Sequence, residues 1–152
     1  MKRLFILISL LFIGLMCFAQ VKVDNTVPYF DVQFKRAFVK GTTLYIDLLF
    51  ENTCAYDTFI QVDPGAIIDD EGNRYAKWYT ENNKGSQYQL TIPAGITQKL
   101  RFVIKNIDEY AASFQVIDFE CFIANKLDPD WHGGARGLVR LRNVPVNRDN
   151  GQ

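Results

Sequence analysis

The sequence is constrained most by short runs in which every second residue is apolar. Residues 44–50 place Leu, Ile, Leu and Phe at alternate positions, and residues 30–38, 100–104 and 117–123 follow the same period of two, with a break at Arg36. Successive side chains of a strand point to opposite faces of a sheet, so this period predicts strands with one buried face. At Arg36 we expect a bulge or an edge position.

Residues that favour tight turns separate these runs. Gly41 and residues 63–65 (Asp-Pro-Gly), 69–72 and 93–95 (Pro-Ala-Gly) each predict a turn. Shorter strands are expected in residues 58–62, 66–68, 73–78, 88–92 and 138–146. No helical period is sustained, and only residues 108–113 fit a single helical turn. Seven to nine short antiparallel strands predict an all-β sandwich or barrel, in which each strand hides one apolar face.

Residues 1–19 have the features of a secretory signal peptide. Lys2 and Arg3 precede an apolar stretch over residues 4–15, which is too short to span a bilayer because a spanning helix needs roughly 20 apolar residues. The small residue Ala19 predicts cleavage before residue 20, and hence an exported protein, periplasmic or extracellular. Residues 20–152 then form a single domain of ordinary size, with loose polar ends at residues 21–26 and 147–152.

Two alternatives to cleavage after Ala19 remain. A lipoprotein anchored through Cys17 is less favoured, because that processing prefers a small residue just before the cysteine and Met16 is large. An uncleaved membrane anchor is the other alternative. Cleavage would remove Lys2 and Arg3, which changes the balance from 17 basic and 17 acidic residues to 15 against 17. A mildly acidic mature domain argues against a general nucleic-acid binder, which needs a basic face.

The order of strands and turns resembles secreted bacterial immunoglobulin-like domains of the MPT-type antigen and its relatives. The resemblance lies in a strand ending in Asn (residues 44–52), an acidic turn with Gly followed by Tyr (70–75), a Pro-Ala-Gly turn (92–95) and a strand carrying Phe (100–104). It implies an antiparallel two-sheet immunoglobulin-like sandwich of seven to nine strands. The family supplies no catalytic residues, and a fold of this kind does not by itself imply a function.

Cys54 and Cys121 both continue the apolar phase of their strands, so both thiols are expected to face the core. In an exported protein they are candidates for a disulfide. The alternative is two separate buried thiols that pack as small apolar side chains. An antibody-type domain would carry a Trp about a dozen residues after the first Cys, and here the next Trp is Trp78.

The sequence predicts no catalytic set, metal site or cofactor. Zinc sites usually need three or four Cys, His or carboxylate ligands, and the chain has a single His, His132. One His also cannot support a triad without a positioned partner. Asp118 and Glu120, two apart on the polar face of one strand, are a candidate carboxylate pair for glycoside hydrolysis, but a solvated strand face is the simpler interpretation.

The strongest candidates for a binding site are aromatic residues outside the alternating runs. Trp78 and Tyr79 precede a polar stretch, and Trp131, His132 and Arg136 lie in a long loop region. Long loops on a rigid sandwich often carry binding residues, and Trp, Tyr and Arg dominate interface hot spots. These five residues are the predicted recognition surface. The alternative is that both Trp side chains fold back to cap the ends of the sandwich.

Three function classes follow. The first is a secreted or periplasmic, non-enzymatic binding module for a protein or glycan partner, without nucleic-acid binding and without a membrane span in the mature chain. The second is a small glycan-acting or hydrolytic enzyme, and the third is a structural envelope subunit whose sheet edge pairs with a neighbour. Neither the ligand nor the oligomeric state follows from the sequence.

Overall fold

The computed structural model describes residues 20–81, 85, 87–124 and 134–148. These residues form nine strands and no helix. The strands are β1 (Lys22–Asn25), β2 (Phe30–Lys40), β3 (Thr43–Asn52), β4 (Thr58–Asp69), β5 (Tyr79–Thr80), β6 (Tyr88–Ile92), β7 (Thr97–Lys105), β8 (Ser113–Ala124) and β9 (Ala135–Pro145). The nine strands agree with the predicted seven to nine.

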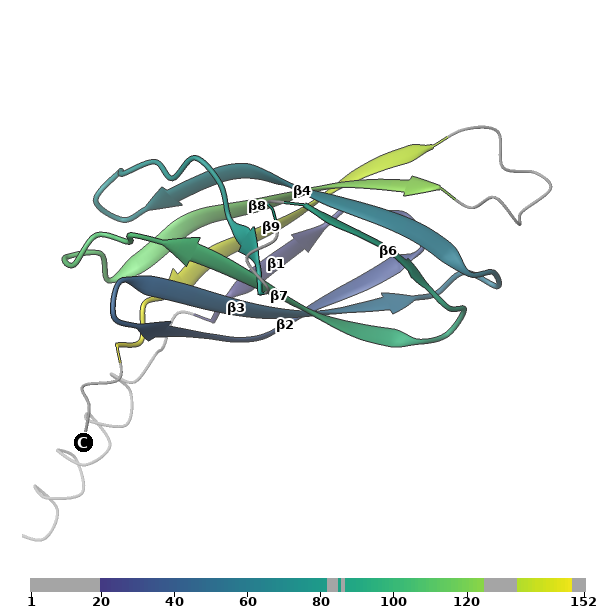
Figure 1. Ribbon diagram of the computed structural model, residues 1–152, viewed down its shortest axis with the longest axis horizontal. Helices are drawn as coiled ribbons and strands as arrows, with labels where there is room; N and C mark the ends of the chain where they lie inside the picture. The colour runs from purple at the N-terminus through teal and green to yellow at the C-terminus, as the bar shows by residue number, and fades with distance from the viewer. Residues whose placement is uncertain (1–19, 82–84, 86, 125–133, 149–152) are drawn as a thin grey trace, which may run out of the picture.

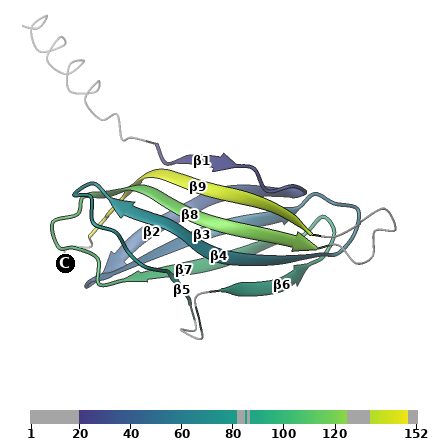
Figure 2. The same ribbon diagram turned by 90° about the horizontal axis from the view of Figure 1, so that it is seen from above.

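The strands form two sheets that lie face to face (Figures 1 and 2). One sheet has five strands in the order β1-β9-β8-β4-β6, and the other has four in the order β2-β3-β7-β5. Every pairing between these strands is antiparallel. The apolar phases of both sheets meet between the layers. The two-sheet antiparallel architecture predicted from the alternation is therefore confirmed.

The register of β2 confirms the expected irregularity at Arg36, because the pairing with β3 shifts between Phe34 and Arg36. The turn predicted at residues 63–65 is wrong. β4 runs continuously through Pro64 and changes register against β8 between Pro64 and Ile67. Strand β6 pairs only with the first half of β4, so Pro64 lies beyond that pairing and next to a bulge. A proline, which has no N–H to donate, is tolerated at such a position.

The N-terminal segment is ordered, contrary to the loose end expected for residues 21–26. Its strand β1 pairs with β9, from Lys22 opposite Arg142 to Asn25 opposite Val139. The side chain of Asn25 then closes the turn into β2. Its Nδ2 donates to the Phe30 carbonyl at 2.8 Å, and its Oδ1 accepts from the Val27 N–H at 2.9 Å. Val21 and Val23 also pack against the core, so a short apolar alternation and local hydrogen bonds together order this segment.

Asp47 is a fully buried carboxylate on the outward phase of β3. Its side chain accepts hydrogen bonds from Arg36 Nε at 2.8 Å, from Arg101 Nε at 2.6 Å and from Arg101 Nη2 at 2.9 Å. These contacts join β2, β3 and β7 across the sheet. The hydrogen bonds from Arg101 lower the pKa of Asp47 to about 2, against the opposing effect of burial.

We predict that Asp47→Asn lowers the free energy of unfolding at pH 7 by about 2–3 kcal/mol, because hydrogen bonds between charged groups are lost. The lowered pKa gives a second signature. In the unfolded chain Asp titrates near 3.9, so the stabilisation is complete above that pH and disappears as the pH falls towards the folded pKa of about 2. Urea unfolding between pH 7 and pH 2.5 measures both effects.

Asp31→Asn, on the exposed face of β2, is the matched control and is expected to change stability by less than about 0.5 kcal/mol. The acid-induced loss of stability should be smaller in Asp47→Asn than in the wild type. An unchanged pH dependence in that variant would contradict the assigned role of Asp47.

Candidate functional site

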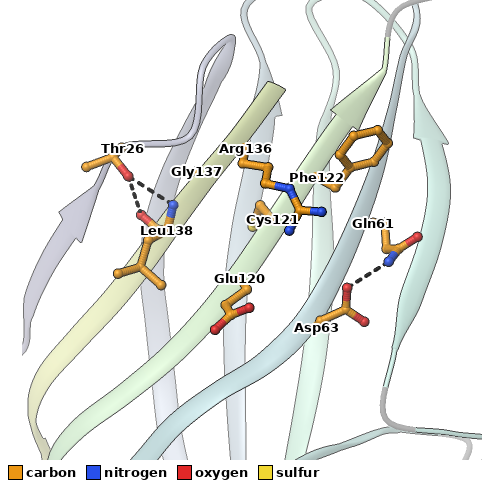
Figure 3. A pocket seen from close by; sticks show the side chains of 9 residues that line it. All are labelled: Thr26, Gln61, Asp63, Glu120, Cys121, Phe122, Arg136, Gly137 and Leu138. Atoms are coloured by element: carbon orange, nitrogen blue, oxygen red, sulfur yellow. Dashed lines mark hydrogen bonds between the residues drawn. The ribbon is translucent and has the colours of Figure 1, made fainter. Parts of the chain in front are cut away.

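A groove lies on the outer face of the five-stranded sheet, over β1, β4, β8 and β9 (Figure 3). Its volume is about 570 Å³. The residues that line it are Thr26, Gln61, Asp63, Glu120, Cys121, Phe122, Arg136, Gly137 and Leu138. Most of the groove is formed by strands instead of loops, since of its lining residues only Thr26 lies outside a strand, just after β1.

Strand register places the groove side chains in two rows that cross the sheet. The first row is Gln61, Phe122 and Arg136, and the second is Asp63, Glu120 and Leu138. Directly opposite residues on neighbouring strands present their side chains to the same face of the sheet. The row between them, with Cys121, has the opposite phase and belongs to the core. Polar and aromatic side chains therefore gather on the solvent side of a buried layer.

One end of the groove depends on close packing between the start of the chain and β9. A Cβ atom at Gly137 would lie 2.5 Å from Val27 Cα and 2.8 Å from the carbonyl oxygen of Thr26. Only glycine allows this approach. The Thr26 backbone N–H donates to the Leu138 carbonyl at 2.9 Å, and the Leu138 N–H donates to Thr26 Oγ1 at 2.9 Å. The wall formed by Thr26 is thus fixed to β9.

The two carboxylates of the groove have different surroundings. Asp63 accepts a hydrogen bond from Gln61 Nε2 at 2.7 Å on one oxygen and from Gln87 Nε2 at 2.6 Å on the other. Within the described residues, neither Glu120 nor Arg136 forms an ion pair. In Figure 3 the Arg136 side chain extends across β8 beside Phe122. The groove thus offers one open cation, one open anion and one aromatic ring to a ligand.

Asp118 lies on the same strand as Glu120 but is already engaged. It receives Arg140 Nε at 2.7 Å and Arg140 Nη2 at 2.7 Å, one on each carboxylate oxygen. This bidentate pair raises the pKa of Arg140. Asp118 is also buried. The backbone of β4 packs closely over it, because a Cβ added at Gly65 would lie 2.7 Å from the Asp118 Cβ. Asp118 and Glu120, considered above as a candidate carboxylate pair for glycoside hydrolysis, are therefore not both open to a ligand.

Trp78 does not belong to a recognition surface, and that part of the prediction is wrong. Its side chain is 0% exposed and packs against Phe102, Phe119 and Tyr88, with ring centroids 4.6, 5.9 and 6.1 Å away. The alternative of an inward-folded Trp describes it better. The residue precedes the short strand β5, and its phase points it between the two sheets.

Of the other predicted site residues, the two that the structure describes do not come together. Tyr79 lies on β5 of the four-stranded sheet, whereas Arg136 lies on β9 of the five-stranded sheet. Each faces outward on its own side of the sandwich, since Tyr79 pairs with Val103 and Arg136 with Phe122. Trp131 and His132 lie outside the described residues. Phe122 was not predicted from the sequence. Its position on the polar phase of residues 117–123 could have indicated an aromatic side chain on the outer face of the sheet.

Cys54 and Cys121 form no disulfide with each other in the structure, so of the two alternatives the separate thiols describe them. Strand β3 ends at Asn52, and the chain turns there, with the Cys54 N–H donating to Asn52 Oδ1 at 2.9 Å. The phase of β3 therefore does not extend to Cys54. Cys121 lies in the middle of β8, where burial raises the pKa of its thiol to about 12. A thiol of this kind is a poor nucleophile.

Two further findings concern the described residues. No helix among them is long and apolar enough to cross a membrane. They also contain no group of three His, Cys, Asp or Glu side chains positioned to hold a metal ion. The proposed signal peptide, residues 1–19 with Cys17, lies outside the described part of the chain.

Comparisons with known proteins add little. No family model matches the sequence, and no curated protein matches it. Among solved structures, the chain is similar to the seventh PapD-like domain of human CEP192, an ASH/PapD-like domain, with a TM-score of 0.43, 12% identity and coverage of 80% of this chain and 92% of that one. The immunoglobulin-like sandwich class therefore rests on the strand pairing of the chain itself.

We predict that Gly137→Ala disrupts the wall of the groove, because the new methyl group meets backbone atoms of residues 26–27 that cannot rotate away. Overpacking of this kind costs about 1–3 kcal/mol. Hydrogen exchange should show loss of protection at the Leu138 amide, which donates to Thr26. The Val144 amide, at the far end of β9, is the internal control. Equal protection of Leu138 in variant and wild type would contradict the close approach.

Proposed function

We propose that this protein is an exported, non-enzymatic binding module that holds a protein partner in the groove over β4, β8 and β9. The observation that carries the proposal is the open arrangement of Arg136, Phe122 and Glu120 on the adjacent antiparallel strands β8 and β9. Arginine and aromatic side chains contribute most of the energy at protein interfaces. Rigid strands also reduce the entropy that binding costs.

The groove chemistry favours a partner with both charges. Arg136 offers a planar set of donors that suits a carboxylate, and Glu120 offers an acceptor for a cation. The two residues are diagonal neighbours across β8 and β9, a relation that separates Cβ atoms by roughly 7 Å. Phe122 lies directly opposite Arg136 and two residues from Glu120 on β8, where it supplies apolar contact. A polypeptide segment carrying an acidic and a basic side chain fits this arrangement.

Export is part of the proposal and has its own support in the sequence. Lys2 and Arg3 followed by the apolar stretch of residues 4–15 have the composition of a secretory signal, and the resemblance to secreted immunoglobulin-like domains agrees with it. Mass spectrometry of the protein recovered from the cell envelope or medium tests this step. We expect a mature chain beginning at Gln20. A chain that retains Met1, or one that begins at a lipidated Cys17, would contradict cleavage after Ala19.

The groove is tested by photo-crosslinking in vivo with benzoylphenylalanine in place of Phe122. We expect a discrete adduct in which mass spectrometry finds peptides of a second protein. This adduct should become at least about tenfold weaker when Arg136→Glu is added, as for loss of an interface hot spot. The matched control carries the crosslinker in place of Tyr110, an exposed aromatic residue outside the groove. The same adduct at both positions, or one that Arg136→Glu leaves unchanged, would overturn the proposed site. An adduct that contains no peptides of a second protein would overturn the protein partner and indicate a glycan instead.

A further inference from the structure

The outer face of the four-stranded sheet carries a second cluster of side chains, remote from the groove. A row of apolar and aromatic residues crosses all four strands in register: Phe38 on β2, Tyr45 on β3, Val103 on β7 and Tyr79 on β5. The Phe38 and Tyr45 rings stack with centroids 5.1 Å apart and an interplanar angle of 8°. We call these four residues the ring row.

On one side of the ring row the charges are balanced. Arg36, Asp47 and Arg101 are directly opposite one another on β2, β3 and β7. Asp47 binds both arginines, and Arg101 Nη1 also lies 2.7 Å from Glu81 Oε1. Two arginines therefore meet two carboxylates, and this side has no excess charge to offer a ligand.

On the other side of the ring row the charged residues that the structure describes in this row of the sheet are all positive. Lys40 on β2 and Lys105 on β7 flank Thr43 in register, and Lys77 lies just before β5. Lys40 Nζ lies 5.9 Å from the centre of the Phe38 ring. Lysines 40 and 77 form no salt bridge with any of the described residues. We call the three lysines with the ring row the lysine–aromatic face.

Tyr79 gathers two of these charges on one ring. Lys77 Nζ lies 5.2 Å and Lys105 Nζ 4.9 Å from its centroid. Each contact is a favourable cation–π interaction, but two ammonium groups at one ring repel each other. An anionic group bound beside Tyr79 would be attracted by both. This part of the surface is strongly cationic, whereas the proposed mature chain has more acidic than basic residues overall.

We propose that the lysine–aromatic face binds an acidic peptide segment in which carboxylate and apolar side chains alternate. Neighbouring strands lie about 4.8 Å apart, so the ring row spans roughly 14 Å, the length of about four extended residues. Carboxylates at alternate positions of such a segment reach the lysines, and the intervening apolar side chains rest on Tyr45, in the middle of the ring row, where no cation of the described part of the chain contacts the ring. Because the lysines lie on one side of the ring row only, the face matches an extended peptide whose carboxylates all project to one side.

Other anionic partners fit the face less well. The faces of the Phe38 and Tyr79 rings are contacted by the chain's own cations, so they are not open for stacking on sugars. The ring row is also half-buried or buried and presents nothing that would insert into a bilayer. The large apolar side chains exposed in the described part of the chain lie elsewhere: Tyr29, Tyr56, Ile96 and Tyr110.

The test is fluorescence anisotropy with a short fluorescein-labelled peptide in which Asp alternates with Val. We expect the full mature protein to bind it, and binding to weaken as salt rises from about 0.05 M to about 0.5 M. The variant Lys40→Gln/Lys77→Gln/Lys105→Gln should bind about tenfold more weakly, as expected for three exposed ion pairs of modest strength. Tyr79→Ala should also weaken binding, because it removes the ring that positions two of the lysines.

Charge-matched and ligand-matched controls separate this face from general electrostatics. The variant Lys22→Gln/Lys35→Gln/Arg74→Gln removes three positive charges elsewhere and should bind the peptide like the wild type. The same peptide with Asn in place of Asp should not bind. Equal losses of peptide affinity in the two triple variants, or no binding of the peptide by the wild type, would overturn the proposal. Tighter binding of polygalacturonate, or of phosphatidylglycerol vesicles, than of the peptide would also overturn it. Arg136→Glu leaves this assay unchanged, so the groove and this face fail or succeed separately.

Discussion

The contact on which the rest of the sandwich depends is the aromatic cluster around Trp78. Phe102 from β7 and Phe119 from β8 approach to 4.5 Å between centroids and so connect the two sheets, and Trp78 lies against both. Tyr88 adds a further link, because it belongs to β6 of one sheet while its hydroxyl donates to the carbonyl of Arg101 in the other. Large, rigid rings of this kind set the spacing of the layers, and the outer faces then become available for recognition.

The alternation of apolar residues was sufficient to predict the strands whose one face is buried, and even the irregularity at Arg36. It failed where hydrogen bonding or chain geometry outweighs pattern. Pro64 and its neighbours have the composition of a turn, yet the segment continues as a bulged strand because β6 has already ended beside it. The segment of strand β1 has only a short apolar alternation, Val21 and Val23, and its order comes also from pairing with β9 and from the close approach that Gly137 permits.

The candidate site was harder to predict because it depends on which residues lie beside one another across strands. Trp78 was misassigned to the surface, since composition ranks Trp as a hot-spot residue and cannot show that it points between two sheets. Cys54 was misassigned because the phase of β3 was extended beyond the strand end at Asn52. Arg136 does lie in a groove, but its neighbour Phe122 becomes visible as a partner only through the register of β8 and β9. Register is a property of the whole sheet and is not encoded in any single run of residues.

The bulged half of β4 has a consequence for the behaviour of the protein in concentrated solution. An exposed sheet edge invites a strand from another molecule and is a common starting point for fibrils. Here Pro64 offers no N–H to an incoming strand, and further along the edge the chain's own return segment occupies the backbone. Tyr75 N–H donates to the Ile67 carbonyl at 3.0 Å, and Arg74 forms a bridge with Ile68. The five-stranded sheet is therefore protected against edge-to-edge aggregation along this stretch, which leaves its outer face accessible even when the protein is crowded.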